Sequence, residues 1–170
     1  MVARITHGSA AYAAHVPLAQ ELIVRSDELR SEALAARVAD EAAYSGVVAA
    51  MALPKATPEE RAARSRKLQA ALVEAAAAPL STARCAKDVA ALAARALAFE
   101  NVALASDVGC AAEFASAGVA AAALNVRVNH RYMNDVVAVA AQRAELERYE
   151  REAERLVTHV RSEVGRALAR

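Results

Sequence analysis

Hydrophobic and polar positions recur with helical spacing along nearly the whole chain, and no segment alternates with a period of two for long. The longest such stretch begins near Pro17, a residue suited to a first helical position, and runs to about residue 51. Its apolar residues lie within about 40° of one line along the helix: Leu18, Leu22, Leu29, Ala33, Ala36, Ala43, Tyr44 and Val47. The pattern therefore predicts a long helix over residues 17–51.

Capping signals divide the remaining chain into further helices. Thr57, Pro58 and Glu60 form a capping box, which predicts a helix from there to about residue 78. We expect a break or kink at Pro79, because proline removes a backbone hydrogen bond, and another helix over 80–98. Residues 1–13 have the spacing of the last turns of a helix. Asn134 or Asp135 is placed to cap a final helix over 136–168.

An alanine-rich helix over residues 101–132 carries polar residues on an apolar face. At 100° per residue, Asp107, Asn125 and Asn129 lie on the same side as Phe114 and Ala122. Their position within the apolar face indicates either a bound ligand or hydrogen bonds between close-packed helices. Asp107 precedes Asn125 by 18 residues, or about 27 Å along a continuous helix, so one small ligand cannot contact both. We therefore predict that Asp107 lies near the reaction centre and that Asn125 and Asn129 make a second, separate contact.

Composition agrees with a helical fold. Hydrophobic residues make up 56% of the 170 residues but aromatic residues only 4%, and five glycines and four prolines are too few for the turns of a β-rich fold. The length suits one domain over 1–170. We predict an all-α bundle of about five to six helices, with long antiparallel helices.

The charge and cysteine content indicate which partners and which cellular compartment to expect. The net charge is +1, with 21 basic and 20 acidic residues mixed along the chain, so no basic footprint for nucleic acid is present. Cys85 and Cys110 have neither zinc spacing nor a disulfide framework. No signal-peptide pattern and no charge-free run of about 18 apolar residues is found. We expect a cytoplasmic protein with reduced thiols and no membrane partner.

Two further residues stand out as candidates for chemistry. Asp40 lies on the apolar line of the 17–51 helix, where a carboxylate removed from water is a candidate general acid or base; the alternative is a buried structural ion pair. Lys55 lies in a loop bounded by prolines, where it is either available to a ligand or simply solvated. The four histidines lack metal-ligand spacing, and no nucleotide-binding or hydrolase motif occurs.

At these residues the chain resembles the cyclodeaminase/cyclohydrolase family of folate enzymes, over roughly residues 1–132. The ordered segments that carry the resemblance are Asp40–Tyr44, Leu53–Lys55, Thr57–Glu60 with Arg64, Ala78–Leu80, Asn101 with Ser106–Gly109, and Ala123–Asn129. Two departures are visible. Family members usually carry a glycine just before the asparagine, where this chain has Glu100. They also begin with a glycine-rich loop and most of a first helix, whereas Met1–Gly8 of this chain resembles only the end of that helix.

The resemblance implies an all-helical homodimer that binds a tetrahydrofolate derivative in a cleft and needs no metal. It implies proton transfer by Asp40, contact of Lys55 with the folate or its glutamate tail, binding of the pterin by Asp107, and a ligand or packing role for Asn125 and Asn129. The leading hypothesis is hydrolysis of 5,10-methenyltetrahydrofolate to 10-formyltetrahydrofolate. The alternatives are ammonia release from formiminotetrahydrofolate and a catalytically inactive folate-binding or structural dimer.

Overall fold

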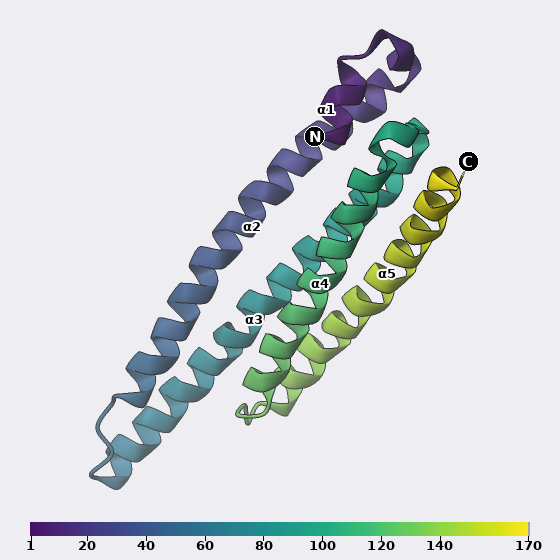
Figure 1. Cartoon of the computed structure of the whole chain (residues 1–170). Coiled ribbons are helices and arrows are strands. Elements are labelled where there is room, and N and C mark those ends of the chain that lie inside the picture. The colour runs from purple at the N-terminus through teal and green to yellow at the C-terminus, as the bar shows by residue number, and fades with distance from the viewer. Residues whose placement is uncertain (170) are drawn as a thin grey trace.

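In the computed structural model, which describes residues 1–169, four long helices form an elongated bundle (Figure 1). A short helix α1 (Val2–His7) and a 3-10 turn η1 (Ala10–His15) precede α2 (Val16–Met51). Then follow α3 (Pro58–Ala96), the 3-10 turns η2 (Leu97–Phe99) and η3 (Val102–Leu104), α4 (Ala105–His130) and α5 (Val136–Leu168). The described residues contain no strand, and the predicted all-α bundle is confirmed.

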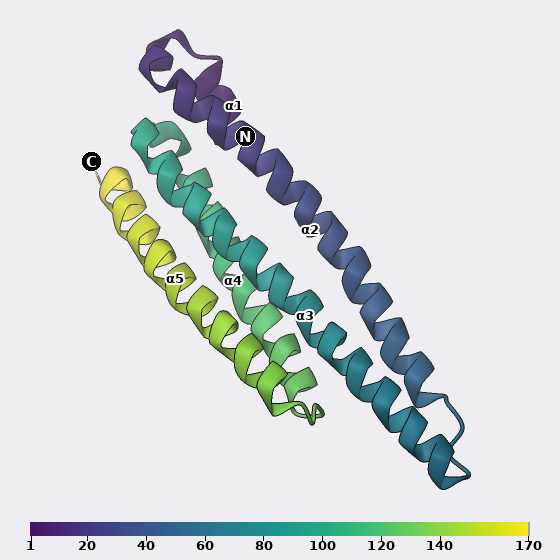
Figure 2. The same ribbon diagram turned by 180° about the vertical axis from the view of Figure 1, so that it is seen from behind.

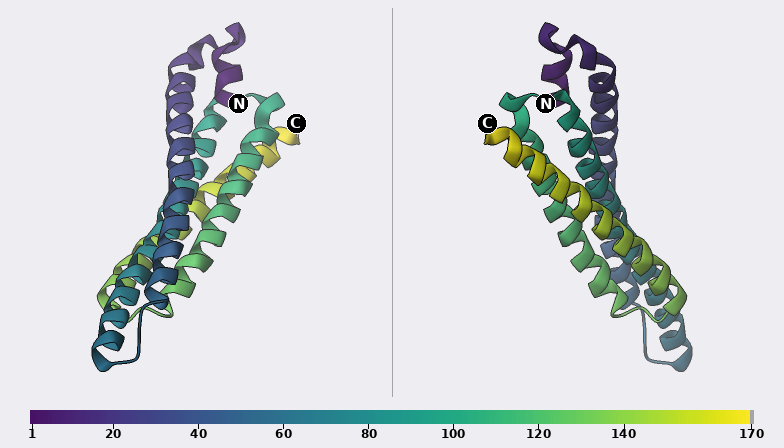
Figure 3. Two further views of the ribbon diagram at one scale, coloured as in Figure 1. Left: turned by 90° about the vertical axis from the view of Figure 1, so that its left-hand side faces the viewer. Right: turned by 90° about the vertical axis from the view of Figure 1, so that its right-hand side faces the viewer.

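The helices are not arranged symmetrically. Helices α3, α4 and α5 contact one another, whereas α2 packs mainly on α3 and on the short α1. Seen from behind, α2 and α5 lie on opposite sides of the bundle (Figure 2). The side views show that the α2–α3 connection lies at the end of the molecule opposite both termini (Figure 3). One face of α2 and one face of α4 therefore have no neighbouring helix within the chain.

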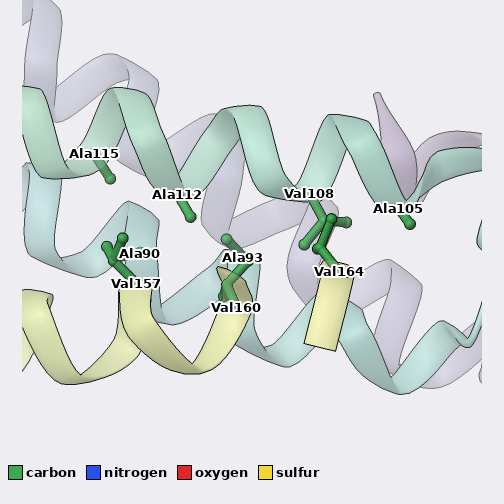
Figure 4. Packing of buried hydrophobic residues seen from close by; sticks show 9 residues of the cluster. All are labelled: Ala90, Ala93, Ala105, Val108, Ala112, Ala115, Val157, Val160 and Val164. Atoms are coloured by element: carbon green, nitrogen blue, oxygen red, sulfur yellow. The ribbon is translucent and has the colours of Figure 1, made fainter. Parts of the chain in front are cut away.

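Small side chains make the packing of α3, α4 and α5 close. Alanines of α3 and α4 meet valines of α5 in a buried cluster (Figure 4). Its members are Ala90, Ala93, Ala105, Val108, Ala112, Ala115, Val157, Val160 and Val164. A Cβ placed on Gly118 of α4 would lie 3.1 Å from the Cβ of Ala86 on α3, so glycine permits the approach of these two helices.

Most predicted boundaries agree with the observed elements. Helices α2 and α5 occupy nearly the predicted ranges, Asp135 caps α5 by accepting from the N–H groups of Val137 and Ala138, and the capping box at Thr57 is formed in both directions. The expected break at Pro79 is wrong, because α3 continues through it as one helix of 39 residues. Tertiary contacts along both sides of α3 offset the missing backbone bond.

The connection between α3 and α4 contains the one non-glycine residue with positive φ among residues 1–169. Glu100, with φ of 50°, adopts the left-handed conformation that favours glycine. Members of the family that the sequence resembles usually carry a glycine at this point. The backbone here therefore keeps the shape that glycine suits, although the side chain differs.

Candidate functional site

The uncovered faces of α2 and α4 border a groove whose floor is α3. The groove encloses about 570 Å³, within the range of small-molecule sites. From α2 it is lined by Asp40, Tyr44, Val47 and Met51, from α3 by Leu68, Leu72 and Ala75, and from α4 and the turn after it by Asn125, Val128, Asn129 and Tyr132. An apolar floor with a few polar groups at its edges is typical of sites that bind a flat organic ligand.

Asp40 lies at the edge of this groove, on the α2 side. Its side chain is exposed, as is that of Tyr44 one turn later. The prediction that Asp40 is removed from water is therefore wrong for a single chain, because α2 has no neighbour other than α3 along this stretch. A ligand in the groove, or a second protein surface over it, would have to exclude the water.

The two asparagines face Asp40 from α4, and their hydrogen bonds differ. Asn125 Nδ2 donates to the carbonyl of Ala121, 3.2 Å away, within its own helix. Asn129 Nδ2 donates to two carbonyls at 2.9 Å each, those of Asn125 and of Ala75 on α3. Both N–H groups of the Asn129 amide are thus used, so Oδ1 is its remaining polar atom and can only accept.

Asp107 does not join this group. It lies in the first turn of α4, and the unbroken helix places it about 27 Å from Asn125. The grouping of Asp107 with Asp40 and Lys55 is therefore wrong within one chain, and the asparagines take its place. The helical spacing predicts one unbroken helix here, as observed over Ala105–His130, but spacing within one helix cannot show which part of α2 lies beside which end of α4.

Lys55 lies beyond the end of the groove that Met51 forms, in the loop between α2 and α3. Its side chain is exposed, but its backbone is held from both sides. Arg61 Nη1 donates to the carbonyls of Lys55 and Ala56, and Arg64 Nε donates to that of Met51. Glu60 Oε2 accepts from the N–H groups of Ala56 and Thr57. The basic first turns of α3 thus act locally, by fixing the loop that presents Lys55.

Tyr132 is a groove residue that the sequence analysis did not select. It follows Asn125 by seven residues, which is close to two helical turns and therefore the same face. The spacing of Tyr132 from Asn125 could therefore have identified it as a candidate from the sequence. No such signal exists for Leu72 and Ala75, because apolar residues of α3 look alike in the sequence whether they face the core or the groove.

A network of charges attaches α2 to α3 away from the groove. Glu32 Oε2 accepts from Arg84 Nη2 at 2.9 Å, and Glu32 Oε1 accepts from Arg25 Nη1 at 2.9 Å. These two hydrogen bonds, of which the one from Arg84 has the larger effect, hold the pKa of the Glu32 carboxyl below its ordinary value of 4.5. Burial raises the pKa of the neighbouring Cys85 thiol. An unreactive thiol and paired carboxylates indicate a structural contact rather than a second reaction centre.

The described residues contain no group of three or more histidine, cysteine, aspartate or glutamate side chains placed to hold a metal ion. One helical stretch, Val102–His130, is long and apolar enough to cross a membrane by length and composition alone. In the bundle it packs on α3 and α5, and 33% of its most apolar window is buried. The absence of a membrane partner stays a prediction.

Comparison with known proteins gives a consistent result. The family model described as formiminotransferase-cyclodeaminase matches residues 1–148. Methenyltetrahydrofolate cyclohydrolase from Methylorubrum extorquens is 36% identical over 170 residues, covering 97% of this chain and 81% of that protein. The crystal structure of formiminotetrahydrofolate cyclodeaminase from Thermotoga maritima superposes with a TM-score of 0.85 and 27% identity, covering 97% of this chain and 78% of that one.

Proposed function

Because this chain belongs to the formiminotransferase-cyclodeaminase family, whose matched members are enzymes of folate one-carbon chemistry, we propose that it hydrolyses 5,10-methenyltetrahydrofolate to 10-formyltetrahydrofolate. The observation that carries the choice is the 36% identity to a methenyltetrahydrofolate cyclohydrolase along almost the whole chain. The groove between α2 and α4 supports it with a volume of about 570 Å³, an apolar floor and polar edges.

The reaction adds water to the carbon that links N5 and N10, and the bond from that carbon to N5 then breaks. A base must accept one proton from the attacking water, and an acid must deliver a proton to N5 as the bond from the carbon to N5 breaks. The remaining hydroxyl proton leaves to solvent as the formyl C=O forms. Asp40 carries out both transfers in our proposal, as a carboxylate first and as a carboxylic acid afterwards. A bound pterin would exclude water from Asp40 and so strengthen its interactions.

The other groove residues bind and orient the folate. Oδ1 of Asn129 accepts from an N–H of the pterin, and Asn125 and Tyr132 border the same ring. Lys55, presented by its fixed loop, attracts the carboxylates of the glutamate tail. Asp107 is too far away to bind the pterin in the same chain, so its proposed contact requires the other chain of a dimer.

We propose a homodimer because apolar residues of α4 and of the turn after it are uncovered. Phe114, Leu124 and Val128 of α4, and Tyr132 in the turn that follows it, are 50–79% exposed. A second copy that packs on this face would cover them and border the groove. We place the protein in the cytoplasm, where its two free cysteines would remain reduced.

The test is a spectrophotometric assay that follows the loss of 5,10-methenyltetrahydrofolate in wild type, Asp40→Asn and the control Glu41→Gln. Glu41 is exposed on the same helix but does not line the groove. We expect turnover above the buffer rate in wild type and Glu41→Gln, and a loss of about 10²–10⁴-fold in kcat for Asp40→Asn. Equal rates in all three proteins would exclude Asp40 as the acid-base group.

The same preparation separates the alternatives. Ammonia release from formiminotetrahydrofolate without methenyl hydrolysis would favour the cyclodeaminase reaction, which the superposition with the Thermotoga maritima enzyme makes the second candidate. Folate binding without either turnover would favour a binding or structural role. Lys55→Ala should raise KM more than it lowers kcat, with Lys67→Ala, an exposed lysine of α3, as the control.

A further inference from the structure

Pro79 lies in the interior of α3 and leaves one backbone carbonyl without its helical partner. In an α-helix the carbonyl of residue 75 accepts from the N–H of residue 79. Proline has no N–H, so the carbonyl of Ala75 has no donor within α3. Pro79 and Ala75 are both buried, where an unpaired carbonyl is costly.

Asn129 of α4 supplies the missing donor. Its Nδ2 lies 2.9 Å from the Ala75 carbonyl oxygen, and the same nitrogen lies 2.9 Å from the Asn125 carbonyl oxygen. Each of the two N–H groups therefore has one acceptor. Rotation of the amide by 180° would place Oδ1 against two carbonyl oxygens and lose both hydrogen bonds, so the two acceptors together fix the orientation.

We propose that Pro79 is a positioning residue for Asn129: by freeing the Ala75 carbonyl it fixes the Asn129 amide, so that Oδ1 is the atom offered to the groove. Ala75 and Asn129 both line the groove. The statement that Oδ1 receives an N–H of the folate rests on the proposed function. The coupling between Pro79 and Asn129 does not, because it concerns hydrogen bonds already made within the chain.

Pro79→Ala tests the coupling, since alanine restores an N–H to position 79. The new N–H competes with Asn129 for the Ala75 carbonyl, so the amide loses part of its anchoring. In a spectrum of protein labelled with ¹⁵N at asparagine, we expect the Asn129 side-chain amide to be protected from hydrogen exchange in wild type. Protection should fall at least tenfold in Pro79→Ala, and Asn129→Ala identifies the resonance.

Activity and stability should move in opposite directions. Pro79→Ala should raise the midpoint of thermal unfolding, because α3 gains a backbone N–H donor and a residue of higher helix propensity, yet lower kcat/KM for methenyltetrahydrofolate several-fold. The control Pro17→Ala removes an exposed proline at the start of α2, where no helical carbonyl is left unpaired, and should change neither exchange nor kcat/KM.

The outcomes are distinguishable. Unchanged exchange of the Asn129 amide in Pro79→Ala would overturn the coupling, whatever the activity. Reduced protection together with unchanged kcat/KM in an active enzyme would overturn the positioning role. Reduced protection in a protein that does not turn over the folate would overturn the proposed function and leave the coupling between the two residues supported.

Discussion

The cluster between α3, α4 and α5 and the edges of the groove between α2 and α4 differ both in the size of their side chains and in their burial. In the cluster, alanines and valines such as Ala112 and Val160 are fully buried. Along the groove, larger residues such as Tyr44 and Tyr132 remain 70% and 61% exposed. The cluster between α3, α4 and α5 thus obtains its packing from small side chains, whereas the exposed tyrosines of the groove are left for contacts with something outside the chain.

That difference explains why one helix serves both purposes. Helix α4 packs on α3 and α5 with its alanines, and the opposite side carries Phe114, Val128 and the groove asparagines. The loss of any buried contact acts on folding. The loss of an exposed apolar residue acts on binding or assembly, because that residue contributes little to the single folded chain.

The largest expected effect comes from the same substitution made in both regions. Val160→Asp places a carboxylate in the buried cluster and should reduce the free energy of unfolding by more than about 4 kcal/mol, enough to abolish folding. Val128→Asp, at a residue 50% exposed, should change it by less than about 0.5 kcal/mol in the monomer. Circular dichroism with urea unfolding measures both.

Val128→Asp also tests the assembly. Sedimentation of wild type should show a dimer, and the variant should dissociate at concentrations at least about tenfold higher, since each interface would desolvate two new carboxylates. A monomeric wild type at micromolar concentration would contradict the proposed homodimer. A variant that loses its helical signal would show that Val128 belongs to the core after all.

An intermediate effect is expected from added volume. Ala112→Leu inserts three carbons between α4 and its neighbours and should cost about 1–3 kcal/mol of unfolding free energy. Ala117→Leu, on the exposed side of the same helix, should cost a few tenths of a kcal/mol. Similar losses in both variants would mean that the two sides of α4 are equally packed.

The smallest effect concerns the charge network that attaches α2. The Glu32 pKa is lower in the folded chain than its ordinary value of 4.5, so its stabilisation is fully present above about that pH and is lost as the pH falls through the folded value. Glu32→Gln should therefore lose about 0.5–1 kcal/mol at pH 7, and the difference from wild type should shrink in acid. Urea unfolding across this range measures it, and a difference independent of pH would contradict the assignment to Glu32.

Short-range patterns in the sequence are enough to predict the local structure. Helical spacing and the caps at Thr57 and Asp135 set the helix boundaries, because these depend on hydrogen bonds within a few residues. The ordered motifs also indicated the family that the comparisons establish. Asp40, Asn125 and Asn129 stand out in the sequence as polar residues on apolar faces, and all three line the groove, while their roles stay predictions.

Which of these residues meet depends on how the helices pack against one another. This packing placed the asparagines rather than Asp107 beside Asp40, left Asp40 exposed, and carried α3 through Pro79 with a hydrogen bond from Asn129 to the unpaired carbonyl. Spacing along one helix fixes a face and a length, but not the register against a neighbour. That register depends on how closely alanine surfaces fit together, and an alanine-rich sequence offers many similar surfaces.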